Sequence, residues 1–313
     1  MFNDVKSLTE LVMRYGTPSA CRKKLLGLRW PNNFITCPQC QHNEIYRFAD
    51  RKRFKCKGCS YKFNVTTGTF FEGSKIPLNK WFVAIYLASS HKKGISSCQL
   101  ARDIGVTQKT AYFMIARIQK SFANVAVEVM DQTVEVDETY VGGKNKNRHY
   151  NKRHRGKYIR GRGSMDKIKV FGMLERESGN VRSTKVPSVG KDDLLPIIRK
   201  HVAPGATICS DEYSSYESLS WHNSGYRHLK VDHSAYLYAN GENHTNTLEG
   251  YWAIGIKRMI MGVHHSFSEK HINRYLSGAD FRYNTRFMTE AQRFDYILAN
   301  SQGRLTYRQL IQK

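Results

Sequence analysis

Acidic residues are scarce in this sequence. Its 313 residues include 26 Asp and Glu against 50 Lys and Arg, which gives a formal net charge of +24 at pH 7. A balance this basic predicts a polyanionic partner, most commonly nucleic acid, with ribosome-associated and membrane-surface proteins as the alternatives. Hydrophobic residues still make up 40% of the chain, so it can build real cores and wholesale disorder is not expected.

Long apolar runs are also missing. No stretch of about eighteen apolar residues occurs, so no membrane span is expected. The opening residues, MFNDVKSLTELVMRYG, carry acids early and lack the apolar core of a secretion signal. We therefore expect a cytoplasmic protein that shares its compartment with the chromosome.

The length of the chain predicts two or three modules. Residues 1–75 hold paired cysteines and short β-rich segments, and residues 76–125 have helical periodicity. Residues 130–290 alternate between β-rich and helical patterns and contain the acidic candidates. Residues 291–313 form an amphipathic tail to which we assign no chemistry.

The cysteines indicate a metal site. There are seven, an odd number, and a reducing compartment favours zinc over disulfides. Four of them form a C-x2-C-x15-C-x2-C pattern in which each pair makes a tight knuckle, with Gly58 suited to a positive φ in the second knuckle. Four thiolates close a tetrahedral shell, so we expect structural Zn²⁺. The zinc ligands are Cys37, Cys40, Cys56 and Cys59.

A helix-turn-helix pattern follows the paired cysteines. Pro77 begins one helix, Ser96 or Ser97 caps a second, Gly105 makes the turn, and Thr107 caps the third. The alternative is a plain helical hairpin with a solvated polar face. In a DNA-binding pair, the residues facing the major groove are Gln108, Lys109 and Tyr112.

The segment 132–143 has strong β character but carries acids in its middle, Glu135, Asp137 and Glu138. Charges within an apolar strand are costly unless they are paired or bind a cation. The alternative is an edge strand with a solvated acidic face.

Further acids lie on later elements. We expect strands at residues 167–175 and 181–187 and a helix at residues 192–201. A short buried strand at residues 206–211, another strand at residues 229–231 and a long helix from about residue 245 onward follow. Asp211 ends the buried strand and Glu249 lies on the late helix. If the sheet gathers these acids with Asp137, the cluster suits Mg²⁺ or Mn²⁺, which can activate a nucleophile at a phosphodiester.

Several long motifs resemble one family. They are CPQC…CKGC, ISSCQLARDIGVTQKTAYFMIARI, VEVDETYVGG, ICSDEYSSY and NHTNTLEGYWAIGIKRMIMGVHHSFSEKHINRYLSGADFRYNTR. From about residue 15 to 290, the chain resembles bacterial insertion-sequence transposases of the ISXO-like type. The resemblance implies an α/β fold: a ribonuclease H-like DDE core, a mixed sheet with flanking helices, preceded by a zinc ribbon and a helix-turn-helix.

The resemblance also implies site residues. Asp137 and Asp211 are the two catalytic aspartates, with Glu135, Glu138 and Glu212 as neighbours of lesser role. Family members carry either a glutamate at the third position or an asparagine followed by a lysine. This sequence offers both options, Glu249, or Asn246 with Lys257. We favour Glu249, because a carboxylate is the better ligand for a hard cation.

A basic segment, residues 144–162, carries nine Lys and Arg and no acid. We expect it to contact the DNA backbone through Arg153 and Arg155, with Arg258 contributing from the late helix. The alternative is a solvated loop.

Together these features predict a transposase. It binds terminal inverted repeats, cleaves DNA with catalytic Mg²⁺ (or Mn²⁺) and joins the 3′-hydroxyl to target DNA, as a homodimer or larger assembly on double-stranded DNA. The alternative is a non-catalytic zinc-ribbon and helix-turn-helix regulator derived from a transposase. A serine or tyrosine recombinase is a weaker third possibility.

Overall fold

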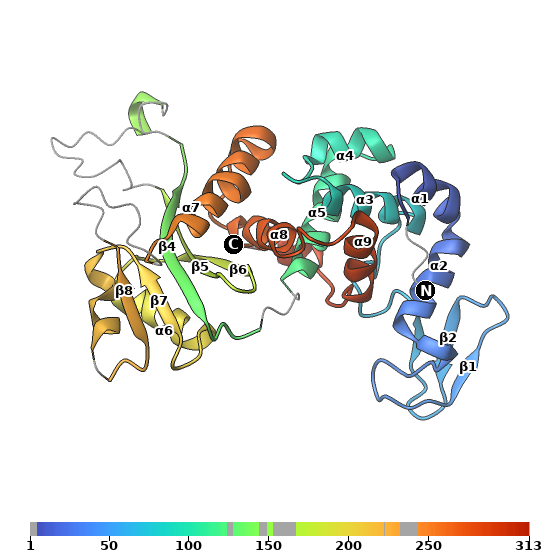
Figure 1. The fold of residues 1–313 in the computed structure, drawn as a ribbon. Helices are drawn as coiled ribbons and strands as arrows, with labels where there is room; N and C mark the ends of the chain where they lie inside the picture. Colours follow the sequence, from blue (N-terminus) through green and yellow to red (C-terminus); the bar gives the residue numbers. More distant parts are fainter. Residues whose placement is uncertain are drawn as a thin grey trace. The chain divides into compact units, whose positions relative to one another are not determined.

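The computed structural model describes residues 5–123, 128–143, 149–152, 167–221, 223–231 and 243–312 (Figure 1). The chain divides into two compact units, residues 1–125 with 285–313, and residues 126–284. Within the described part of the chain, every helix is too short or too polar to cross a membrane.

The first unit begins with two helices and a small sheet. The helices are α1 (Leu8–Tyr15) and α2 (Pro18–Arg29). The antiparallel sheet has the order β1-β2-β3, formed by Ile45–Arg47, Arg53–Cys56 and Lys62–Asn64. These strands lie within the segments that the sequence predicted to be β-rich. The rings of Trp30, Phe54 and Phe63 pack against one another with centroids 5.5–6.0 Å apart and form the core beside the sheet.

Three helices follow, α3 (Leu78–Ser90), α4 (Ser97–Ile104) and α5 (Gln108–Phe122). Helices α4 and α5 begin where the sequence predicts them, and Pro77, predicted to begin the first helix, directly precedes α3. The Ser96 side chain caps α4, and the Thr107 side chain accepts from the backbone N–H of Thr110 to cap α5. Gly105 ends α4 with a φ of 60°, a left-handed conformation that suits glycine.

The C-terminal residues complete the first unit. Helix α9 (Glu290–Ala299) packs against α3, and α10 (Tyr307–Ile311) packs against α5. Arg117 is buried, and its guanidinium donates to the backbone carbonyls of Phe70, Glu72 and Leu305. These hydrogen bonds tie α5 both to the segment after the small sheet and to the C-terminal segment.

The second unit is built on a five-stranded sheet with the order β6-β5-β4-β7-β8. Strands β4 (Thr133–Val141), β5 (Ile168–Glu175) and β6 (Val181–Val186) pair antiparallel. Strands β7 (Thr207–Ser210) and β8 (Arg227–Lys230) continue the sheet in parallel on the other side of β4. This mixed sheet confirms the predicted α/β, ribonuclease H-like fold class.

Helices cover both faces of the sheet (Figure 1). One face packs Val134 and Val136 against α6 (Lys191–His201) and the 3₁₀ helix η4 (Ser214–Ser220). The opposite face packs against the long helix that begins with α7 (Asn246–Tyr251) and against α8 (Ile272–Asn284). Because side chains alternate along a strand, Glu135 and Asp137 point toward the α7 face.

The long helix is less regular than the single α-helix that the sequence predicts. Its α-helical start at α7 passes into two π-helical segments, η5 (Trp252–Lys257) and η6 (Ile260–His264). Helix α8 (Ile272–Asn284) then closes the unit. A π-helical turn inserts an extra residue per turn and is often found at functional sites.

Replacing the buried guanidinium tests its role in the first unit. We expect Arg117→Met to lower the free energy of unfolding by about 2–4 kcal/mol, because buried carbonyls lose their charged donor. The control Arg102→Met removes an exposed guanidinium on α4 and should change stability by less than about 0.5 kcal/mol. Urea unfolding with hydrogen exchange of the α5 amides measures both, and wild-type protection in Arg117→Met protein would contradict the assignment.

Candidate active site and zinc centre

The four predicted zinc ligands come together. Among the described residues, Cys37, Cys40, Cys56 and Cys59 are the only group of at least three His, Cys, Asp or Glu whose ligand atoms all lie within 4.8 Å of one another. The Sγ atoms of Cys37 and Cys59 are 3.7 Å apart, and those of Cys40 and Cys56 are 3.5 Å apart. Tetrahedral zinc with 2.3 Å bonds to sulfur places its ligands about 3.8 Å apart. The cysteines therefore fit a structural zinc ion with no open coordination position.

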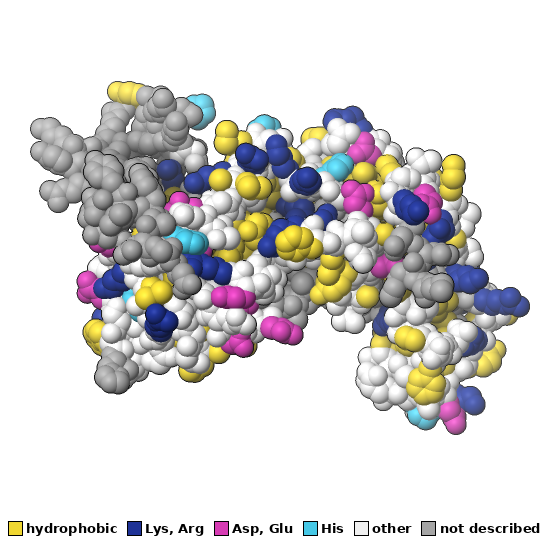
Figure 2. Space-filling view, in the orientation of Figure 1, with side chains coloured by type: hydrophobic (Ala, Val, Ile, Leu, Met, Phe, Trp, Pro, Cys, Tyr) yellow, Lys and Arg dark blue, Asp and Glu magenta, His cyan; other side chains and the backbone are white. Residues whose placement is uncertain are grey.

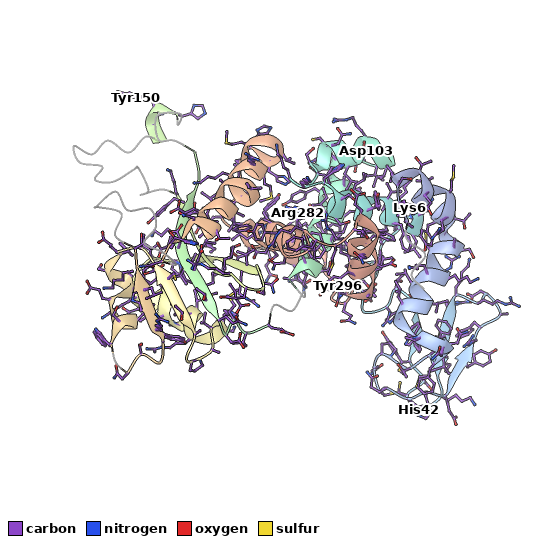
Figure 3. All side chains as sticks on the ribbon, in the orientation of Figure 1. Lys6, His42, Asp103, Tyr150, Arg282 and Tyr296 are labelled. Carbon is purple, nitrogen blue, oxygen red and sulfur yellow. The ribbon has the colours of Figure 1, made fainter. Side chains whose placement is uncertain are left out.

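The sequence predicted a positive φ at Gly58, and this prediction was wrong. Its φ is not in the left-handed region; the residues with positive φ beside the two knuckles are Gln41 (62°) and Ser60 (61°). A Cβ on Gly58 would instead lie 3.2 Å from the ring of His42, which Figure 3 labels. The absence of a side chain at Gly58 thus allows this ring to pack closely against the backbone.

The two predicted catalytic aspartates lie on neighbouring strands. In the parallel pairing of β4 with β7, Glu135 is opposite Cys209. Continuing this register by two residues brings Asp137 beside Asp211, just after the end of β7. The carboxylate of Asp211 accepts a hydrogen bond from the backbone N–H of Tyr213 at 3.1 Å.

The charged form of the Asp137 carboxyl group is destabilised by its surroundings. Burial raises its pKa to about 7, and the negative charges of Asp211 and Glu249 add to the rise. Its Oδ2 accepts a hydrogen bond of 2.9 Å from the indole Nε1 of Trp252. Burial likewise raises the pKa of Glu138 to about 8, although the hydroxyl of Tyr216 donates to this carboxyl.

The third position lies at the start of α7. Glu249 is exposed, and its Oε1 is 3.3 Å from the donor hydroxyl of Thr245. Asn246 is exposed one helical turn earlier, and Lys257 is exposed on η5. Of the two candidates for the third position, Glu249 has a charge that acts on Asp137.

The three acids proposed to bind the metal are less tightly clustered than the four cysteines. In the part of the chain that the structure describes, only the cysteines satisfy the 4.8 Å condition. The negative charges of Asp211 and Glu249 thus act on Asp137, although the three acids do not form a cluster of ligand atoms like that of the cysteines.

Glu135 anchors the helix to the sheet. It is fully buried and accepts from the Arg176 guanidinium at 2.7 Å and from the backbone N–H of Leu248, in the first turn of α7, at 2.9 Å. His244 Nδ1 lies 3.2 Å from the same carboxylate. The sequence indicated only a lesser role for Glu135 and did not identify Arg176, His244 or Trp252. A buried glutamate requires a partner, but only the fold determines which residue supplies it.

The predicted DNA-binding residues on α5 differ in their exposure to solvent. Gln108 and Lys109 are exposed at the start of α5, where Gln108 donates to the Ser97 hydroxyl and the Lys109 ammonium lies 5.3 Å from the ring centroid of Tyr307. Tyr112 is half-buried and packs against a cluster shared by α5 and the C-terminal segment.

The remaining predicted DNA contacts lie on the second unit. Arg258 is exposed beside Lys257, and Lys and Arg side chains gather over the helices of this region in Figure 2. Arg153 and Arg155 lie outside the described residues.

Comparisons with known proteins identify the class of protein. Residues 16–62 match a transposase zinc-ribbon domain, and residues 129–284 match an ISXO2-like transposase domain. The protein is therefore a transposase by class. It belongs to the family of ISXO2-like insertion-sequence transposases with an N-terminal zinc ribbon.

Two relatives are similar in sequence. An uncharacterized protein in the transposable element ISH50 of Halobacterium salinarum is 29% identical over 265 residues, which cover 82% of this chain and 88% of that protein. An uncharacterized transposase-like protein of Haemophilus influenzae is 30% identical over 104 residues, covering 33% of this chain and 80% of that protein.

Solved structures give only weak likenesses. A chain of a simian T-cell lymphotropic virus intasome, in complex with a PP2A regulatory subunit, is 14% identical with a TM-score of 0.30, and the match covers 58% of this chain and 63% of that chain. A chain of a pre-cleavage Mos1 transpososome is 11% identical with a TM-score of 0.26, covering 67% and 75%. TM-scores this low carry no argument about function.

The zinc centre can be tested by removing one ligand. We expect Cys56→Ser protein to lose the one zinc ion per chain that the wild type retains after dialysis, because three thiolates no longer close the shell. Elemental analysis measures the zinc, and protease resistance of residues 37–64 measures the fold of the ribbon. The control Cys98→Ser alters an exposed cysteine outside the cluster and should keep its zinc; retention of one zinc by Cys56→Ser protein would refute the site.

The raised pKa of Asp137 predicts how the stability of the protein depends on pH. In buffer without divalent cations other than the zinc of the ribbon, Asp137→Asn should raise the free energy of unfolding at pH 8 by about 2–4 kcal/mol. The folded protein binds the Asp137 proton more tightly than the unfolded chain, so the contribution of this group to stability falls as pH rises from about 4 to about 8. The gain should therefore disappear near pH 4. Urea unfolding across this range measures it, and an equal gain at both ends would contradict the cause.

Proposed function

We propose that this transposase binds the terminal inverted repeats of its element and catalyses Mg²⁺-dependent DNA strand cleavage and strand transfer. The observation that carries the proposal is the parallel register of β4 and β7, which, continued by two residues, sets Asp137 in the middle of β4 beside Asp211 at the end of β7. The electrostatic effect of Asp211 and Glu249 on Asp137 supports it.

The donor set fits a hard divalent cation. Carboxylate oxygens are the ligands that Mg²⁺ and Mn²⁺ prefer. Burial and neighbouring negative charge hold the pKa of Asp137 near 7, and a bound cation would favour the ionised form. Asp137, Asp211 and Glu249 would hold the metal, with Asn246 as the alternative to Glu249. When bound, such ions activate a water or 3′-hydroxyl and stabilise the leaving oxygen of a phosphodiester.

The side chains around the acids would bind and orient the DNA. Lys257 and Arg258 are exposed on the helix that carries Glu249, where they can contact the phosphate backbone. Arg153 and Arg155 of the basic segment would add backbone contacts. With the metal activating the nucleophile, the reaction needs no covalent enzyme–DNA intermediate.

The first unit would recognise the repeats. The net charge of +24 and the paired helices α4 and α5 support this role. Gln108 and Lys109 begin the helix that would enter the major groove, with Tyr112 one turn further on. Two element ends must be joined, so we expect at least two subunits on the DNA.

A non-catalytic regulator is the second candidate. Among the described residues, the three acids do not form a group of close potential metal ligands as the cysteines do, as would suit a core that binds DNA without cleaving it. Repeat binding without cleavage in Mg²⁺ or Mn²⁺ would favour this candidate.

A nicking assay on repeat-ended DNA tests the proposal. We expect Mg²⁺-dependent cleavage by the wild type, and a loss of about 1000-fold or more in Asp137→Asn and in Asp211→Asn protein, because each removes a metal ligand worth several kcal/mol. Asp192→Asn alters an exposed acid on α6 and should cleave like the wild type. Full cleavage by Asp137→Asn protein would rule out the assigned site.

A further inference from the structure

Gly172 leaves a space directly beside Asp137. The two residues are opposite each other in the antiparallel pairing of β5 with β4. A Cβ added to Gly172 would lie 2.5 Å from Cζ2 and from Cη2 of Trp252. This distance is far below van der Waals contact, so a side chain at residue 172 would displace the indole ring.

The indole that fills this space is fixed in position. Trp252 is 2% exposed and belongs to the core on the α7 face of the sheet. Its ring packs against that of Tyr251 with centroids 5.3 Å apart. The indole N–H is a donor only, and it donates to Asp137 Oδ2 at 2.9 Å.

The two acids on this face of β4 have different partners. Glu135 is neutralised by the Arg176 guanidinium at 2.7 Å. Asp137, two residues on, accepts from neutral donors among the described residues, namely the Trp252 indole and the backbone N–H of Glu138. A cationic donor would offset the charge that attracts a metal, whereas a neutral N–H orients the carboxylate and leaves its charge available.

We propose that Trp252 is a positioning residue that orients the Asp137 carboxylate for a divalent cation, and that Gly172 provides the space for its indole. This inference rests on the proposed function. A hydrogen bond that orients a ligating carboxylate affects metal affinity about 10- to 100-fold when it is removed.

Manganese binding to the full-length, zinc-loaded protein tests the role without relying on activity. Electron paramagnetic resonance of free Mn²⁺ gives the dissociation constant. Trp252→Phe keeps an aromatic ring but loses the N–H, and it should bind Mn²⁺ about 10-fold or more weakly than the wild type. The control Trp221→Phe, which alters an exposed tryptophan of the same unit, should bind like the wild type.

Asp137→Asn separates the two possible failures. If it removes a Mn²⁺ site and Trp252→Phe binds with wild-type affinity, the positioning role is refuted while the proposed function stands. If the wild type has no Mn²⁺ site that Asp137→Asn removes, the proposed function itself fails.

A double-mutant cycle tests the role of Gly172. Gly172→Ala should weaken Mn²⁺ binding about 10-fold in the wild type, because the new Cβ moves the indole away from Asp137. In the Trp252→Phe background its effect should be less than about twofold, since a phenyl ring lacks Cζ2 and Cη2. Equal effects in both backgrounds would overturn the steric argument.

Terbium luminescence of the wild-type protein provides a second test of the proposal, which does not require Trp252→Phe protein to fold. Tb³⁺ is a hard cation that takes oxygen ligands and emits strongly when a nearby indole absorbs light. In wild-type protein, excitation of tryptophan should produce Tb³⁺ emission that Asp137→Asn abolishes and Trp221→Phe preserves. If Tb³⁺ binds at a site that Asp137→Asn removes and tryptophan excitation yields no emission, the indole does not adjoin the metal and the proposal is wrong.

Discussion

The parallel pairing of β4 with β7 is the constraint on which the candidate active site depends. Asp137 and Asp211 are far apart in sequence, and the register that sets Glu135 opposite Cys209, continued by two residues, carries them side by side where β7 ends. Parallel strands need a crossover connection, and α6 with its apolar face against Val134 and Val136 supplies it. A shift of this register by one residue would turn Asp211 to the face of the sheet opposite that of Asp137.

Strand β4 carries an acid that anchors the fold, Glu135, and the acid that we propose binds the metal, Asp137. Glu135 is paired with Arg176 and accepts from the first turn of α7, so it fixes the helix that carries Glu249. Asp137 keeps a raised pKa because burial and neighbouring acids oppose its ionisation. Perturbed carboxyl groups of this kind are typical of functional sites, and they reduce the stability of the fold when the cation is absent.

Local signals explain what the sequence could predict. Cysteine spacing located the zinc ligands, and the caps at Ser96 and Thr107 with the turn at Gly105 located α4 and α5, because each depends on residues a few positions apart. The partners of the acids could not be found in this way. Trp252 meets Asp137 only because Gly172 leaves space on the neighbouring strand. The π-helical segments have no simple sequence pattern, and the packing role of Gly58 depends on a contact with His42.

The central claim is that Asp137 and Asp211 share a divalent cation. Anomalous diffraction from crystals of the zinc-loaded protein soaked in Mn²⁺ tests it most directly, since manganese and zinc are distinguished by their absorption edges. The account predicts a manganese peak between these two carboxylates, within about 2.0–2.3 Å of an oxygen of each. Well-ordered carboxylates with no manganese between them, in crystals that hold the metal elsewhere, would contradict it.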